Sequence, residues 1–184
     1  MSANSPDRGS SLLRLYIDVA VWRRGPQDLP TAPLLLPLSV LAYFMVYIAS
    51  EWLARRIVRG DVSNGLSVVT LALDVLYVAG WYWLLLRLFR RSERYGQTTA
   101  AIFGCTALLT LPLALAAQLL IASSNGGIAW LAPLMLCAIA ALVVWSVLIL
   151  AHILRHALER PLALCVILVI AQLVSEQLLV SALP

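Results

Sequence analysis

Charged residues are scarce in this chain, and lysine is missing altogether. Only 12% of the residues are charged, and all thirteen basic residues are arginine. A soluble domain carries about 25% charged and about 45–50% apolar residues. This chain is 62% hydrophobic, and 184 residues could not bury that much apolar surface from water. The composition therefore excludes a soluble globular protein and indicates a membrane protein.

Cysteine is also rare, and none of the common catalytic motifs occurs. The three cysteines lie within apolar runs and form no C-x-x-C pair, so neither a disulfide framework nor a zinc knuckle is indicated: Cys105, Cys137 and Cys165. There is no Walker loop, G-x-S-x-G turn, metalloprotease helix or glycine-rich dinucleotide turn. His152, His156 and Glu159 share a helix face but lack a fourth ligand, which is typical of an ordinary helix end. We therefore predict no enzyme activity and no catalytic, cofactor-binding or metal-binding residue.

Five stretches are long and apolar enough to cross a bilayer, for which a helix needs about 20 mostly apolar residues. They are residues 33–53, 66–86, 98–121, 131–154 and 162–183. The longest piece outside them is the segment of residues 1–32, which is too short for a soluble domain. The sequence thus predicts an all-α fold, a polytopic transmembrane helical bundle of about five spans over residues 33–184.

The N-terminal segment contains an amphipathic stretch at about residues 11–24. Arg14 and Asp18 lie four residues apart on its narrow polar strip, and Trp22 lies near its end. A helix of this length cannot cross a bilayer but can lie in the headgroup plane. We predict an interfacial helix that the pair Gly25-Pro26 ends, with packing against the bundle as the alternative.

The arginines predict the orientation, because cytoplasmic segments carry an excess of basic residues. Ten of the thirteen fall on the side of the N-terminus, and the other three are Arg55, Arg56 and Arg59. We therefore expect a cytoplasmic N-terminus and an outer C-terminus in the cell inner membrane. Tyr82 and Trp83 should then lie in the aromatic belt at the cytoplasmic boundary.

Polar residues inside the spans form one stripe on each of two predicted helices. Thr70, Asp74 and Tyr77 share a face of the second span, and Gln172 and Glu176 share a face of the fifth. The two carboxyl groups lie at similar depth, where keeping both of them ionised would cost free energy because of desolvation and their mutual repulsion. We expect either that one or both are protonated or that an arginine from the end of the first span pairs with one of them. The candidate charge partners are Arg55 and Arg56.

This cluster has two interpretations, because polar groups in hydrocarbon are costly and need a reason to be there. It can fix the bundle through hydrogen bonds between helices, or it can form a proton relay or polar cleft. We accordingly predict a partner-binding or membrane-organising bundle, with a small transporter or channel as the alternative and an intramembrane enzyme as a third reading. The expected partners are membrane lipids and possible protein or self-association, and no nucleic acid, because no basic stripe with interleaved aromatics occurs.

Four short sequence elements occur in a characteristic order along this architecture. They are WRRGP at residues 22–26, TLP at 110–112, WSVL at 145–148 and ILR at 153–155. In this order the chain resembles the bacterial branch of the Yip family, the Ypt/Rab-interacting membrane proteins. The resemblance covers roughly residues 12–183 in architecture but only these elements in sequence. It implies a non-enzymatic five-span bundle that acts through protein partners or membrane organisation.

Overall fold

The computed structural model describes residues 12–30, 32–57, 68–124 and 130–182, and no β-strand occurs among them. The described residues form six α-helices and two short 3-10 helices, η1 and η2. The α-helices are α1 (Leu12–Ala20), α2 (Leu35–Ile57), α3 (Val68–Leu88), α4 (Tyr95–Ser124), α5 (Leu131–Leu158) and α6 (Leu162–Ala182), and the 3-10 helices are η1 (Pro26–Asp28) and η2 (Ser92–Arg94).

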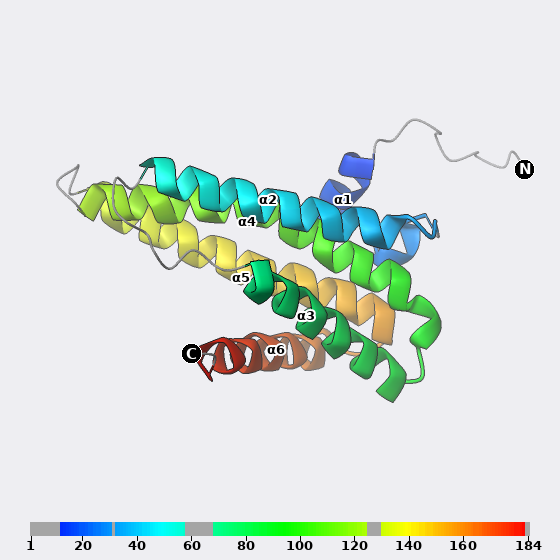
Figure 1. The fold of residues 1–184 in the computed structure, drawn as a ribbon. Coiled ribbons are helices and arrows are strands. Elements are labelled where there is room, and N and C mark those ends of the chain that lie inside the picture. The colour runs from blue at the N-terminus through cyan, green and yellow to red at the C-terminus, as the bar shows by residue number, and fades with distance from the viewer. Residues whose placement is uncertain (1–11, 31, 58–67, 125–129, 183–184) are drawn as a thin grey trace, which may run out of the picture.

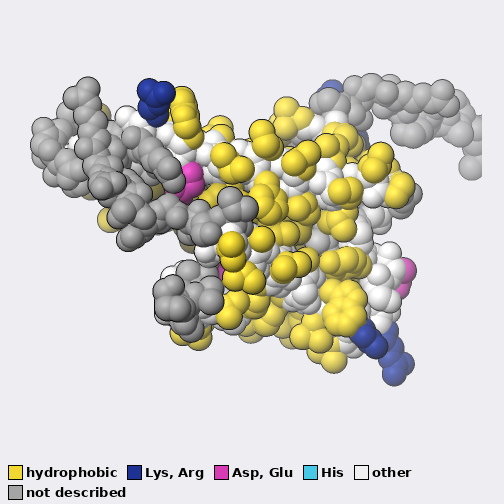
Figure 2. All heavy atoms as spheres, viewed as in Figure 1, with side chains coloured by type: hydrophobic (Ala, Val, Ile, Leu, Met, Phe, Trp, Pro, Cys, Tyr) yellow, Lys and Arg dark blue, Asp and Glu magenta, His cyan; other side chains and the backbone are white. Residues whose placement is uncertain are grey.

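The long helices α2 to α6 are each long and apolar enough to cross a membrane, which confirms the predicted all-α polytopic bundle. They run alternately in opposite directions, so that α1 and the last turn of α6 lie at opposite ends of the bundle (Figure 1). Hydrophobic side chains cover the face that Figure 2 shows. In the most apolar 18-residue stretch of α5, only 11% of the residues are buried within the chain. Lipid or another protein must therefore cover the others.

The central helix of the bundle is α4, which packs along α2 on one side and α5 on the other (Figure 1). Its buried face is rich in small residues, which let neighbouring backbones approach closely in a membrane. These residues are Ala100, Ala101, Gly104, Cys105 and Ala107. Helix α6 packs on α5 and α3, while α3 contacts α4 and α6 over a smaller surface.

The N-terminal arm, which we define as residues 12–30, folds back on the bundle and contacts α4 and α5. Its helix α1 ends at Ala20, four residues before the predicted end, and the predicted breaker is not what stops it. Trp22 takes a left-handed conformation with a φ of 61°. The backbone amides of Arg23 and Arg24 then both donate to the carbonyl of Asp18, which closes the helix end.

Candidate functional site

Polar side chains from α2, α3 and α6 form one hydrogen-bonded network inside the bundle. The Tyr43 hydroxyl donates to Oδ2 of Asp74 at 2.8 Å. On the other side, the hydroxyl of Tyr82 donates to Oε1 of Gln172 at 2.7 Å. Nε2 of Gln172 in turn donates to Oε2 of Glu176 at 3.3 Å. The network therefore links three spans that are distant in the sequence.

A small cavity of about 90 Å³ lies beside this network. Asp74 and Glu176 both line it, and the two carboxyl groups interact with each other there. All five spans contribute to its wall, with Tyr43 from α2, Asp74 from α3, Phe103 from α4, Leu150 from α5 and Gln172 from α6. The volume is enough for a few water molecules at most, since each needs roughly 30 Å³ in the liquid.

The predicted polar cluster is largely brought together. Asp74, Gln172 and Glu176 meet at the cavity, and the Tyr77 hydroxyl lies 2.5 Å from the hydroxyl of Ser175 on α6. Thr70 is the exception, because it lies one turn from Asp74 along α3 and does not line the cavity.

Of the two arginines proposed as charge partners, Arg56 makes a different contact in the structure. The guanidinium of Arg56 lies over the ring of Trp52 at 5.0 Å from its centre, as in a cation–π contact. No described ion pair joins it to Asp74 or Glu176. The side chain of Arg55 lies outside the described residues, so its predicted pairing is not placed.

Two tyrosines of the network, Tyr43 and Tyr82, were not predicted to belong to it. Tyr43 was not singled out, because it stands among apolar residues in the first span. Tyr82 was predicted in the interfacial belt beside Trp83, yet its side chain is 0% exposed. Of these two residues only Trp83 is exposed, and the guanidinium of Arg87 lies over its ring at 5.0 Å from the centre. The signal available from the sequence for a partner such as Tyr82 was the glutamine at position 172 inside an apolar span, since its amide needs hydrogen-bond partners there.

The hydrogen bond from Tyr43 to Asp74 gives a first testable prediction. Tyr43→Phe should lower the free energy of unfolding by about 0.6 kcal/mol, the measured average for such bonds between membrane helices, and by no more than about 1.7 kcal/mol, the measured maximum. Tyr47→Phe is the matched control on α2, because the Tyr47 hydroxyl has no hydrogen bond among the described residues. Thermal unfolding in detergent measures both variants, and an equal loss in the two would contradict this role of Tyr43.

The end of the bundle that holds α1 is rich in arginine, and ion pairs connect the segment before α4 with the end of α5 there. Arg91 and Arg94 both pair with Glu159, and Nη2 of Arg94 lies 2.8 Å from Oε1 of the carboxylate. Nη1 of Arg94 also donates to the backbone carbonyl of His156 at 2.9 Å, which caps the last turn of α5. Glu159 has a φ of 55° at the turn into α6. These contacts fix the corner between α5 and α6.

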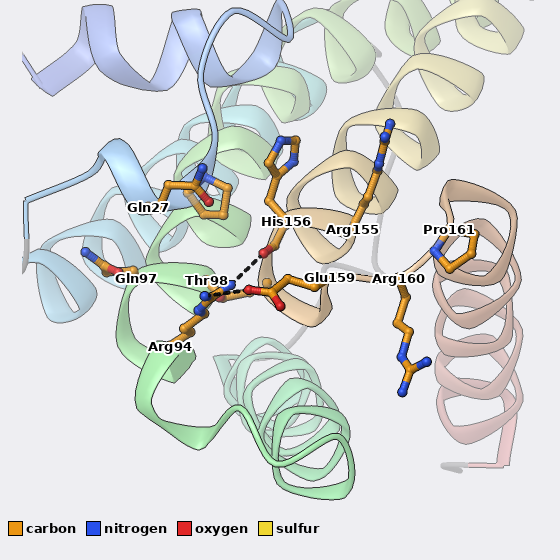
Figure 3. Close-up of a pocket in the computed structure, with 11 residues that line it drawn as sticks. Gln27, Arg94, Gln97, Thr98, Arg155, His156, Glu159, Arg160 and Pro161 are labelled. Atoms are coloured by element: carbon orange, nitrogen blue, oxygen red, sulfur yellow. Dashed lines mark hydrogen bonds and ion pairs between the residues drawn. The ribbon is translucent and has the colours of Figure 1, made fainter.

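A pocket of about 840 Å³ opens at this end, between the arm, the start of α4 and the α5–α6 corner (Figure 3). Gln27 of the arm and Gln97 and Thr98 of α4 lie on one side of it. The α5–α6 corner supplies Arg155, His156, Glu159 and Arg160, and Arg94 reaches across toward Glu159. This pocket was not predicted, because it depends on how the arm folds back onto helix ends distant in sequence.

The arm is held on the bundle by aromatic contacts. The ring of Trp22 stacks on His152 of α5, with centres 5.0 Å apart and planes 12° from parallel. The Tyr16 hydroxyl lies 2.6 Å from the hydroxyl of Ser39 on α2. The tyrosine ring packs so closely over Gly104 of α4 that a Cβ there would lie 2.2 Å from its Cε1. The helix α1 therefore packs on the bundle with one face, as the alternative reading of this segment predicts.

Of the charged residues predicted on α1, Asp18 interacts with the turn that follows the helix. Asp18 pairs with Arg24, with 3.6 Å between the Nε and Oδ2 atoms. His152 and His156 contact each other and the arm. Among the described residues, no three His, Cys, Asp or Glu side chains are grouped so that they could hold a metal ion.

Comparisons with known proteins identify no family for this chain. No family model matches it, and no curated protein or solved structure is similar enough to show a relationship. The resemblance to the Yip family thus has no support from these comparisons.

Proposed function

We propose that this protein is a non-catalytic, membrane-organising bundle, in which the five spans are the anchor and the N-terminal arm is the contact surface for lipid. The main observation that supports this proposal is that α1 has two apolar faces. One face packs on the bundle through Leu15, Tyr16 and Val19. The other is exposed although it is apolar, and it comprises Leu13 and Ile17, with Val21 directly after the helix.

The exposed face of the arm has the features of an interfacial surface. Its apolar residues recur every four positions, so they form one row along α1. Arg23 and Arg24 follow the helix and are exposed, and Trp22 beside them is 41% exposed. An apolar row flanked by arginine and tryptophan is typical of a helix that lies on an anionic lipid surface.

The orientation belongs to the same proposal. The arginines of the arm, of the α3–α4 connection and of the α5–α6 corner lie at one end of the bundle. By the positive-inside rule this end faces the cytoplasm, with the C-terminus on the other side of the cell inner membrane. The Yip-like order of sequence elements agrees with a membrane-organising bundle, but the proposal does not depend on it.

Transport is less well supported than organisation. The polar groups of Asp74 and Glu176 are hydrogen-bonded within the bundle. The cavity beside them is small, and among the described residues it shares no lining residue with the large pocket at the arginine-rich end. A conducting path would need polar groups that connect the two, so the network is better explained as interhelical bonding.

A photo-crosslinking experiment in membranes tests the proposed contact surface. Benzoylphenylalanine at position 17, where Ile17 is 46% exposed, should form adducts with lipid. The same residue at position 19 is the matched control, because Val19 is 1% exposed and faces the bundle. A protein adduct at position 17 would make the arm a docking site for a protein partner and overturn the lipid proposal. The absence of any adduct there would also overturn it.

A further inference from the structure

The pocket at the arginine-rich end carries positive charge that no described carboxylate balances. Its one described carboxylate, Glu159, already pairs with Arg91 and Arg94. Arg155 and Arg160 also line the pocket, and neither takes part in a described ion pair. Arg160 lies over the ring of Phe89 at 5.5 Å, which holds it at the rim without neutralising it. Arg155 and Arg160 are both exposed, so their charges are available to an anion that enters the pocket.

Neutral donors and a helix end complete the pocket wall. Gln97 and Thr98 lie in the first turn of α4, where the helix dipole is positive and favours an anion. Thr98 is 1% exposed, and its hydroxyl has no hydrogen-bond partner among the described residues. The negative end of α5 also points here, but the bond from Arg94 to the His156 carbonyl covers it. Gln27 adds a side-chain amide from the arm.

The position and size of the pocket indicate the kind of anion. Its volume of about 840 Å³ is within the usual range for sites that hold small organic ligands. It lies at the ends of membrane-crossing helices, level with the arginine-rich connections. Basic pockets between transmembrane helices at this depth are suited to the phosphate groups of lipid headgroups.

We infer that this pocket binds the phosphate of an anionic lipid headgroup, with Arg155 and Arg160 as its charge partners and Gln27, Thr98 and the start of α4 as hydrogen-bond donors. The Nε2 of Gln97 is not counted among them, because it already donates to the carbonyl of Leu29 at 2.9 Å. The site names anionic phospholipid as the class of lipid that the proposed membrane-organising function involves. The assignment of the ligand to a lipid rests on that proposed function. Guanidinium groups suit this ligand because they bind phosphate with charge-assisted hydrogen bonds.

The inference is tested by lipid-dependent thermal stability of the purified full chain in dodecylmaltoside. Short-chain phosphatidylglycerol should raise the melting temperature of the wild type, and phosphatidylcholine should not. Arg155→Gln with Arg160→Gln should weaken the apparent affinity for phosphatidylglycerol by at least about tenfold, as expected for the loss of one good charged contact. The matched control is Arg87→Gln with Arg90→Gln, which removes two exposed arginines from the same end outside the pocket and outside the arm. It should bind within about twofold of the wild type.

Further measurements keep the result interpretable if the double variant is unstable. Gln27→Glu changes an exposed pocket residue and should weaken lipid binding while both arginines remain. An equal loss in the Arg87/Arg90 control, or equal stabilisation by phosphatidylcholine, would overturn the site. Inorganic phosphate that stabilises the wild type as well as the lipid does would overturn the lipid source and leave a free-phosphate site. Failure here would leave the crosslink at position 17 unaffected, so the two proposals can fail separately.

Discussion

Gly104→Ala should release the N-terminal arm from the bundle. The added Cβ would lie 2.2 Å from Cε1 and 2.5 Å from Cδ1 of Tyr16, which is far closer than the van der Waals contact distance between two carbon atoms. The ring cannot easily turn aside, because its hydroxyl is bonded to Ser39 and its backbone belongs to α1. Overpacking of this kind costs about 1–3 kcal/mol, and here the cost falls on the docking of the arm.

Limited trypsin digestion in lipid nanodiscs measures that release, because Arg23 and Arg24 lie in the arm. Cleavage there should be at least about fivefold faster in Gly104→Ala than in the wild type, the population change that 1 kcal/mol produces. Gly80→Ala is the matched control, since a Cβ at that helical glycine meets nothing within 4 Å. Wild-type cleavage rates in Gly104→Ala would show that Tyr16 does not hold the arm.

Gln172→Leu should be the most destabilising single change in the polar network. It removes the acceptor of the Tyr82 hydroxyl, which is 0% exposed and has no access to water. It also removes the donor to Glu176 on the same helix. Each buried group left without a partner costs about 1–3 kcal/mol, so the loss should exceed that of Tyr43→Phe.

A double-mutant cycle with Tyr82→Phe tests this explanation. Once the hydroxyl is absent, leucine at position 172 leaves one fewer unpaired group, so the double variant should lose less stability than the sum of the single variants. Unfolding in detergent or nanodiscs gives the three free energies. Strictly additive losses would mean that Tyr82 and Gln172 do not depend on each other, contrary to the 2.7 Å bond between them.

The five spans could be predicted because hydrocarbon permits few backbone arrangements. Each span must satisfy its own amides, so a long apolar run becomes a helix whatever its partners are. The same reasoning predicted that Asp74 and Glu176 would be turned inward, since their stripes repeat at the period of a helix. The structure brings these two residues to one cavity.

The partners of these residues could not be predicted, because they depend on how neighbouring helices are rotated. Nothing in the first span distinguishes Tyr43 from Tyr47, yet the structure bonds Tyr43 to Asp74. The small residues of α4 permit a close contact without specifying which element makes it. The contact is made by Tyr16 of the arm, whose return onto the bundle has no signal in hydropathy.

Proton flux into proteoliposomes tests most directly whether Asp74 and Glu176 hold the bundle together or conduct. With the full chain reconstituted around a pH-sensitive dye, an imposed proton gradient should decay at the rate of protein-free vesicles. Asp74→Asn, which keeps an acceptor for Tyr43, should leave that rate unchanged. A flux above the protein-free rate that Asp74→Asn abolishes would contradict the structural role of the network and make the protein a proton carrier.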